Sequence, residues 1–253
     1  MDFLKYDDPL IVSFTQAVQT GDLDALSRLL NEVPGLAAKR FVDDKGGTRT
    51  TLHVVTDWPG YFPNGPEIAT LLIEAGADPN VPATGGKFSE TPLHWAASSD
   101  DADVAEALID GGADLEALGG SIGGGTPLDN AVGYGCWNVA RLLVQRGARV
   151  DKLWHAAALG LISRVVELVD SQPELTAADI NQAFWHACCG GQRRVAEYLL
   201  SKGADINGIP DYTNLTPLDA AASLDTRRDT LVSWLKSKGA KSSKADAADH
   251  ARD

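Results

Sequence analysis

The chain has 253 residues, of which 44% are apolar and 23% are charged. Both fractions are close to the average of folded globular domains, which excludes a chain that is disordered or fibrous throughout. Its 22 Lys and Arg residues against 35 Asp and Glu residues give a formal net charge of −13. This average field repels nucleic acid and anionic membrane surfaces.

The N-terminal residues and the cysteines favour a cytoplasmic protein without a membrane anchor. No apolar stretch approaches the length of about 20 residues that crosses a bilayer. Residues 1–8 are interrupted by charges, unlike a secretory signal. Cys136, Cys188 and Cys189 are odd in number, and two of them are adjacent. This is not a disulfide framework, so we expect a reducing compartment.

Four stretches of the chain repeat one another. The first and loosest begins with Thr51-Leu52-His53 and ends with Gly76-Ala77-Asp78-Pro79-Asn80. The others begin and end in the same way, at Thr91-Pro92-Leu93-His94 to Gly112-Ala113-Asp114, Thr126-Pro127-Leu128-Asp129 to Gly147-Ala148, and Thr216-Pro217-Leu218-Asp219 to Gly239-Ala240. Within each copy, apolar residues recur at helical spacing.

Each piece of the repeat has a physical role. Thr is a common helix cap, Pro suits the first helical turn, and Leu packs in the core. Paired Ala residues let two helices approach closely, and Gly supplies a left-handed residue after the second helix. In this order the pieces resemble the ankyrin repeat, whose signature is T-P-L-H-x-A over about 33 residues. The resemblance implies an all-α ankyrin-repeat solenoid of helix pairs with short β-hairpin fingers.

The core position of the motif recurs seven times and predicts about seven helix pairs between residues 10 and 241. It falls on Phe14, Leu52, Leu93, Leu128, Leu153, Phe184 and Leu218. We therefore expect a single ankyrin-repeat array over residues 1–241, with an insertion at residues 57–66. Residues 242–253 are small and polar, and we expect them to be a disordered tail.

Departures from the repeat predict local differences. Residues 150–152 alone join the fourth pair to the fifth, and residues 171–180 join the fifth to the sixth, with Thr176 as a helix cap. We therefore expect some fingers to be missing at these two joints. The insertion carries three prolines and three aromatic residues, which indicates a stiff loop. It could be a lid or wall of the groove, a plug that fills it, or a self-packed ornament.

In ankyrin proteins the residue after the motif's fourth position tends to face the concave side of the solenoid. The resemblance therefore implies a partner-binding surface there, with two aromatic residues of the insertion beside it. The candidate binding residues are Trp58, Tyr61, Trp95, Asn130, Tyr134, His155 and His186. The alternative is that these side chains pack against neighbouring fingers and helices.

Several other residues allow two interpretations. His53 and His94 are expected to bond the adjoining turn. Trp154 and Trp185 either fill the space of a missing finger or line a pocket. The Gly119–Gly125 run lacks the Lys-Ser/Thr ending of a phosphate-binding loop, so it is a finger hairpin or a flap.

The leading functional prediction is a non-catalytic protein–protein interaction module that binds its partner through the concave face. The net charge favours a basic or neutral partner surface, and we expect no cofactor and no metal. The alternative is a small-molecule site or an enzyme in the concave groove, with His155 and His186 as acid/base residues. No catalytic motif supports this alternative.

Overall fold

The computed structural model describes residues 3–222 and 227–243. Within these residues, fourteen α-helices form seven consecutive pairs, which confirms the predicted fold class. The pairs are α1 (Pro9–Thr20) with α2 (Leu23–Glu32), α3 (Thr51–Val55) with α4 (Gly65–Glu74), α5 (Pro92–Ser99) with α6 (Ala102–Asp110), α7 (Pro127–Tyr134) with α8 (Trp137–Gln145), α9 (Leu153–Ala158) with α10 (Ile162–Ser171), α11 (Ala177–Cys189) with α12 (Arg193–Ser201), and α13 (Pro217–Ala221) with α14 (Asp229–Ser237).

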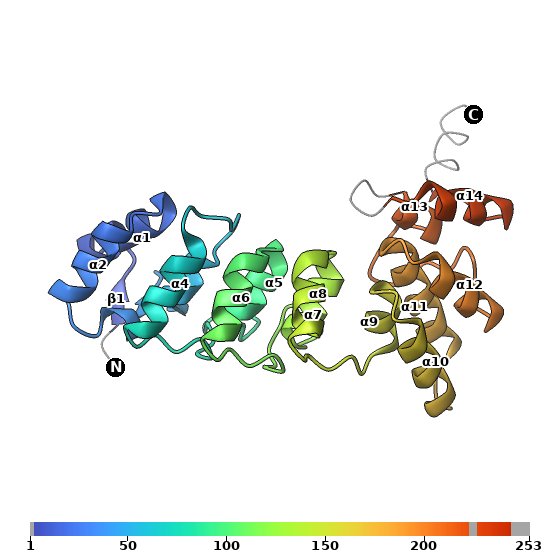
Figure 1. Cartoon of the computed structure of the whole chain (residues 1–253), viewed down its shortest axis with the longest axis horizontal. Helices are drawn as coiled ribbons and strands as arrows, with labels where there is room; N and C mark the ends of the chain where they lie inside the picture. The colour runs from blue at the N-terminus through green and yellow to red at the C-terminus, as the bar shows by residue number, and fades with distance from the viewer. Residues whose placement is uncertain (1–2, 223–226, 244–253) are drawn as a thin grey trace. The chain divides into compact units, whose positions relative to one another are not determined.

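The chain forms two compact units, Met1–Ala148 and Arg149–Asp253. In the first unit the helices stack in two rows, which Figure 1 shows in blue to green. The inner row is α1, α3, α5 and α7, and the outer row is α2, α4, α6 and α8. In the second unit α9, α11 and α13 stack in one row, with α10 packed on α12. That the two units form a single array stays a prediction.

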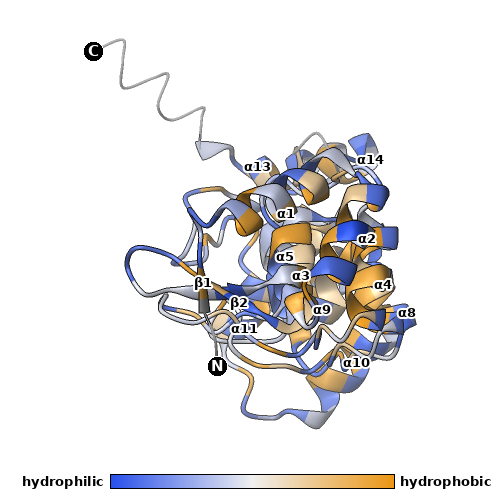
Figure 2. Cartoon of the chain, turned by 90° about the vertical axis from the view of Figure 1, so that its left-hand side faces the viewer, coloured by the Kyte–Doolittle hydropathy of each residue, from blue (hydrophilic) through white to orange (hydrophobic). Residues whose placement is uncertain are grey.

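The core follows the repeat. All seven residues at the predicted core position are buried, with exposed fractions between 0% and 6%. Burial of one such Leu or Phe side chain contributes about 1.5–3 kcal/mol. Figure 2 shows the hydropathy of the residues along each helix, with α4 mainly hydrophobic and α2 carrying strongly hydrophilic stretches. No helix in the described part of the chain is both long and apolar enough to cross a bilayer.

Threonine caps begin most of the motif helices, as predicted. Thr126, Thr176 and Thr216 each accept a hydrogen bond from the backbone N–H three residues on. That residue is an aspartate in all three cases, and its carboxylate accepts a hydrogen bond from the backbone N–H of the threonine. In α3 and α5 a histidine takes the aspartate's place. Thr50 N–H donates to His53 Nδ1 at 3.2 Å, and Thr91 N–H donates to His94 Nδ1 at 3.1 Å. The capping box thus starts helices of both units.

The fingers differ in part from the prediction. The first one pairs as strands, with β2 (Arg40–Val42) antiparallel to β3 (Thr48–Thr50) and β1 (Phe3–Lys5) parallel to β2. The next two fingers contain no named strand, and only a bridge joins Thr48 to Thr84. Prolines and paired glycines in residues 79–86 and 119–125 explain this, because they weaken strand pairing. Residues 149–152 and 172–176 contain no strand either, which confirms the two missing fingers.

The predicted insertion, 57–66, and the predicted tail, 242–253, each differ from the structure at one end. Gly65 and Pro66, within the predicted insertion 57–66, form the first turn of α4, so a loop of residues 57–64 remains. Ser242 and Ser243, at the start of the predicted tail, hydrogen-bond to the Asp219 carboxylate. The remainder of the predicted tail, 244–253, lies outside the described residues.

Candidate functional site

The seven candidate binding residues divide between the two units. Trp58, Tyr61 and Tyr134 lie in the first unit with exposed fractions of 79%, 61% and 53%. Trp95 is half-buried and Asn130 is fully buried in the same unit. His155 and His186 lie in the second unit, and both are buried. The structure thus brings five of the seven residues into one unit.

Three of these aromatic residues line one hollow of about 450 Å³ on the inner row of the first unit. We refer to it as the Trp58 pocket. Its lining consists of Thr56, Asp57, Trp58, Glu90, Trp95, Ser98, Ser99, Ser121 and Tyr134. The pocket therefore combines three aromatic side chains with two carboxylates and five hydroxyl groups.

The 57–64 loop is held in place by polar bonds at Tyr61 and at its last residue, Asn64. The N–H of Tyr61 donates to Asp101 Oδ2 at 2.7 Å, and its hydroxyl donates to the Asp100 carbonyl at 2.5 Å. The amide of Asn64 donates to the Gly21 carbonyl at 2.8 Å. Tyr61 and Asn64 have φ values of 56° and 54°, in the left-handed region that costs a non-glycine residue energy. The loop is therefore an ordered wall beside α5 and not a plug, because it leaves Trp58 exposed.

Glu90 is the centre of a second polar network. Its Oε1 accepts the backbone N–H of Ser121 at 2.8 Å and the side-chain amide of Asn130 at 2.7 Å. The same Asn130 accepts the N–H of Ile122 on its Oδ1 at 3.2 Å. Gly119–Gly125 is thereby fixed as an ordered turn, closed by backbone bonds between Gly120 and Gly125. The buried Asn130 thus positions the Glu90 carboxylate and the turn that carries Ser121.

Arg49 connects this pocket to the first finger. Its guanidinium pairs with Asp57 at 2.7 Å and lies 5.6 Å from the centroid of the Trp95 ring. The ring of His53 packs edge-on against Trp95, with 4.9 Å between the ring centroids. His53 Nε2 donates to the Glu90 carbonyl at 3.0 Å. Burial lowers the pKa of His53 to about 3, so it is neutral and structural at physiological pH, as predicted.

A second hollow of about 430 Å³ adjoins the first and shares Glu90 and Trp95 with it. We refer to it as the finger pocket, because the finger residues supply most of its wall. That wall includes Lys45, Arg49 and Lys87. The two pockets therefore differ in charge, with basic side chains concentrated in the finger pocket.

The second unit has an aromatic cluster of its own. The Trp154 ring lies 4.1 Å from that of His155 and 4.8 Å from that of His186. Nε2 of His186 is 3.0 Å from the Tyr212 hydroxyl, and the Trp185 indole N–H donates to the Leu215 carbonyl at 2.8 Å. Burial, with a smaller contribution from His155, lowers the pKa of His186 to about 3. At neutral pH this imidazole is uncharged.

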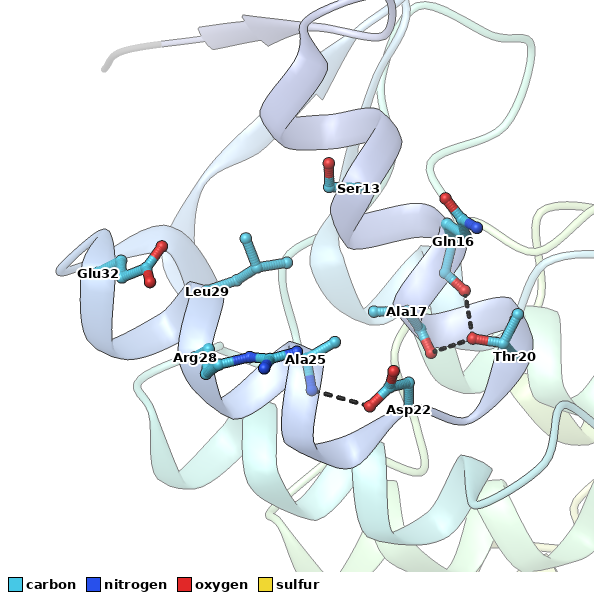
Figure 3. A pocket seen from close by; sticks show the side chains of 9 residues that line it. All are labelled: Ser13, Gln16, Ala17, Thr20, Asp22, Ala25, Arg28, Leu29 and Glu32. Atoms are coloured by element: carbon cyan, nitrogen blue, oxygen red, sulfur yellow. Dashed lines mark hydrogen bonds between the residues drawn. The ribbon is translucent and has the colours of Figure 1, made fainter.

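A third hollow, of about 290 Å³, lies between α1 and α2 and is drawn in Figure 3. Its polar groups serve local helix structure. The Thr20 hydroxyl donates to the Gln16 carbonyl, and Asp22 accepts the Ala25 N–H to cap α2. It has no aromatic side chain in its lining, and we assign it no binding role.

Sequence reasoning did not single out Glu90, Arg49 or Ser121. Glu90 directly precedes the Thr91 cap, and Arg49 directly precedes the Thr50 cap. A charged residue directly before the capping threonine could have indicated both Glu90 and Arg49, because that position lies where the finger meets the inner-row helix. Which pocket each of these residues lines depends on finger geometry, which the repeat does not encode.

Most of the chain resembles known proteins in sequence. The sequence profile described as ankyrin repeats (3 copies) matches residues 61–152 and 153–246. The chain is 28% identical over 240 residues to the B-cell lymphoma 3 protein homolog of Mus musculus, covering 86% of this chain and 48% of that protein. It is 29% identical over 151 residues to ZDHHC13 of Danio rerio, named as a palmitoyltransferase, covering 60% of this chain and 19% of that protein.

The fold also resembles a solved structure, the ankyrin repeat domain of human ASB11. The TM-score is 0.52 at 19% sequence identity, over 90% of this chain and 98% of that one. At this identity the likeness concerns the fold alone. The chain spans about half or less of the length of the two curated relatives named above.

Proposed function

Because the chain belongs to the ankyrin repeat family, whose repeats typically serve as protein-interaction modules, we propose that it binds a partner protein through the inner row of its first unit. The Trp58 pocket is the observation that carries this proposal. Its aromatic side chains are of the type that dominates binding energy at protein interfaces, and two of them are more than half exposed.

The exposure of Trp58 is the strongest single support. An indole with 79% of its surface in water contributes little to the core, yet the loop that carries it is bonded to two neighbouring repeats. Large exposed apolar side chains on an ordered surface are typical of interaction sites. The buried His155 and His186 play no direct part in this proposal, because a partner would reach them only after the cluster opened.

The three thiols support a reducing, cytoplasmic location for this binding. Cys136 and Cys188 are buried and form no disulfide within the part of the chain that the structure describes. Burial raises the pKa of Cys136 to about 11, so this thiol is protonated and unreactive at neutral pH.

Site-specific photocrosslinking tests the proposed function. A benzophenone amino acid is placed at position 58, and the partner is captured in cells of the source organism. We expect a crosslink to a polypeptide that is lost when Trp95→Ala is added, while the same probe at the exposed Ile209 of the second unit gives none. Equal capture from both positions, or capture that Trp95→Ala leaves unchanged, would contradict the proposal.

A small organic ligand is the second candidate, and the pocket volume is the observation that favours it. About 450 Å³ falls in the range of about 300–1,000 Å³ typical of ligand pockets. Native mass spectrometry of protein recovered from its own cells separates the two. Retention of a few hundred daltons, lost in Trp58→Ala, would support a small ligand, whereas the added mass of a whole protein supports the partner.

A further inference from the structure

The lining of the Trp58 pocket has the composition of a site for a cation. Trp58, Trp95 and Tyr134 offer aromatic rings, and Asp57 and Glu90 offer carboxylates. Neither Lys nor Arg is among the described residues that line this pocket. Aromatic faces attract a cation through the ring quadrupole, and carboxylates add charge-assisted hydrogen bonds.

The two carboxylates are in different states. Asp57 already pairs with Arg49 at 2.7 Å. Glu90 accepts two neutral N–H groups on Oε1 and, among the described residues, forms no ion pair with Lys or Arg. Its negative charge is thus fixed in position by hydrogen bonds but has no cation beside it. The nearby Asp100 and Asp101 accept only neutral N–H groups in the same way.

Arg49, which lines the adjoining finger pocket, already lies against one of the aromatic residues of the Trp58 pocket. The Arg49 guanidinium lies 5.6 Å from the Trp95 ring centroid and 4.6 Å from that of Tyr6. Contacts of this length are typical cation–π interactions. The Trp58 indole has no such contact among the described residues, although it lines the same hollow.

The adjoining finger pocket indicates an extended occupant. It shares Glu90 and Trp95 with the Trp58 pocket, so a chain segment can cross both. The finger pocket is lined by Lys45, Arg49 and Lys87 against the two carboxylates of Asp43 and Glu90. Its lining therefore carries an excess of basic groups, whereas the charged residues described in the lining of the Trp58 pocket are carboxylates alone. The two pockets thus give the bound segment a direction, with its positive charge at the Trp58 end.

From the aromatic rings, the unpaired Glu90 and the net charge of −13, we infer that the Trp58 pocket takes a lysine or arginine side chain of the partner protein. This inference rests on the proposed function and specifies the chemistry of the partner. The cationic head lies against Glu90, and its methylene stem packs on the indoles.

The test uses a phage-displayed library of random 12-residue peptides selected on the full chain. We expect the selected peptides to share one Lys or Arg at a fixed position. Glu90→Gln should weaken the best peptide about tenfold, since about 1.4 kcal/mol corresponds to a factor of ten. The variant keeps the Oε1 acceptor for Ser121 and Asn130, and the exposed Glu74→Gln is the matched control, with no expected effect.

A double-mutant cycle isolates the contact. Replacing the peptide's basic residue by norleucine should weaken binding to the wild-type chain about tenfold but should change binding to Glu90→Gln little. If Glu90→Gln melts early, the affinity of the norleucine peptide for the wild-type chain still measures the contribution of the positive charge. Selected peptides without a shared basic residue, or equal affinity for Glu90→Gln and Glu74→Gln, would overturn the inference.

The outcomes separate the inference from the proposed function. If Trp58→Ala abolishes binding of the selected peptides while Glu90→Gln and the norleucine substitution do not weaken it, the inner row still binds partners and the cation inference is wrong. If the selected peptides bind Trp58→Ala and Trp95→Ala as well as the wild type, both the inference and the proposed function fail.

Discussion

The side-chain amide of Asn130 donates to the Glu90 carboxylate at 2.7 Å, so one buried residue of the fourth repeat sets the position of an acidic group of the third. Asn130 also bonds Ser98 and the Ile122 N–H. Asn130 was expected on the concave surface, but it is fully buried, and these bonds explain why a polar amide is buried there. Its role is to arrange the pocket wall, because it holds both Glu90 and the turn that carries Ser121.

Removal of this amide should destabilise the first unit and disturb its pocket. Asn130→Ala leaves the Ile122 N–H without its acceptor and removes one of the two donors to Glu90, so we expect a loss of about 1–3 kcal/mol in the free energy of unfolding. Urea denaturation followed by tryptophan fluorescence measures it. The exposed Asn214→Ala is the control and should change stability by less than about 0.5 kcal/mol. A loss no larger in Asn130→Ala than in this control would rule out the network.

Asp101 and Asp22 form a matched pair that tests how the 57–64 loop is held. Each caps an outer helix, through the N–H of Val104 and of Ala25 respectively, but only Asp101 also accepts the Tyr61 N–H. Both Asp→Ala variants should lose about 1 kcal/mol from the cap. Asp101→Ala alone should also raise amide hydrogen exchange in residues 57–64. Equal exchange there in the two variants would show that the loop is held by other contacts.

Acid should destabilise the protein through its buried imidazoles. Burial lowers the pKa of both His53 and His186 to about 3, against an unfolded value of 6.5. Between these values the unfolded chain binds a proton that the folded chain does not, so stability is retained above pH 6.5 and falls as the pH decreases toward 3. Each group contributes a slope of about 1.4 kcal/mol per pH unit.

The His186→Gln variant tests whether the buried imidazole makes the protein less stable as the pH decreases. Urea unfolding between pH 6 and pH 4.5 should show a shallower loss of stability in the variant than in the wild type, by about 1.4 kcal/mol per pH unit. Parallel curves would mean that His186 is protonated in the folded state.

The two indoles of the second unit should differ in their contribution to stability. Trp185 donates its N–H to the Leu215 carbonyl at 2.8 Å, whereas no hydrogen bond of the Trp154 indole is found among the described residues. Trp185→Phe should therefore cost about 1 kcal/mol more than Trp154→Phe. Thermal unfolding of the two variants makes the comparison. A larger loss in Trp154→Phe would assign the structural role to that indole instead.

The repeat predicts most of the fold because it encodes local chemistry. The Thr cap, the core Leu and the closing Gly each act within a few residues, and the seven core positions are buried as expected. The two missing fingers follow from the short joints at residues 149–152 and 172–176. The finger strands were less predictable. The glycines and prolines of residues 79–86 weaken strand pairing, so this finger turns back on itself without a ladder of strand hydrogen bonds.

The candidate site was predicted in outline only. Exposed Trp58, Tyr61 and Tyr134 follow from the insertion and the inner-row register. Glu90 and Arg49, by contrast, come from the fingers, and their side chains reach Asn130 and Trp95 on helices of the next repeat. Which helix a finger side chain contacts depends on how the repeats stack on one another. The periodic motif does not encode this.

Hydrogen-exchange mass spectrometry of the chain with its crosslinked partner tests the central claim most directly. The account predicts protection in residues 56–61, 95–99 and 121–134, which carry the Trp58 pocket, and little change in the outer-row helices α2, α4 and α6. Protection confined to those outer helices, or to residues 149–222, would show that the partner binds elsewhere and would contradict the account.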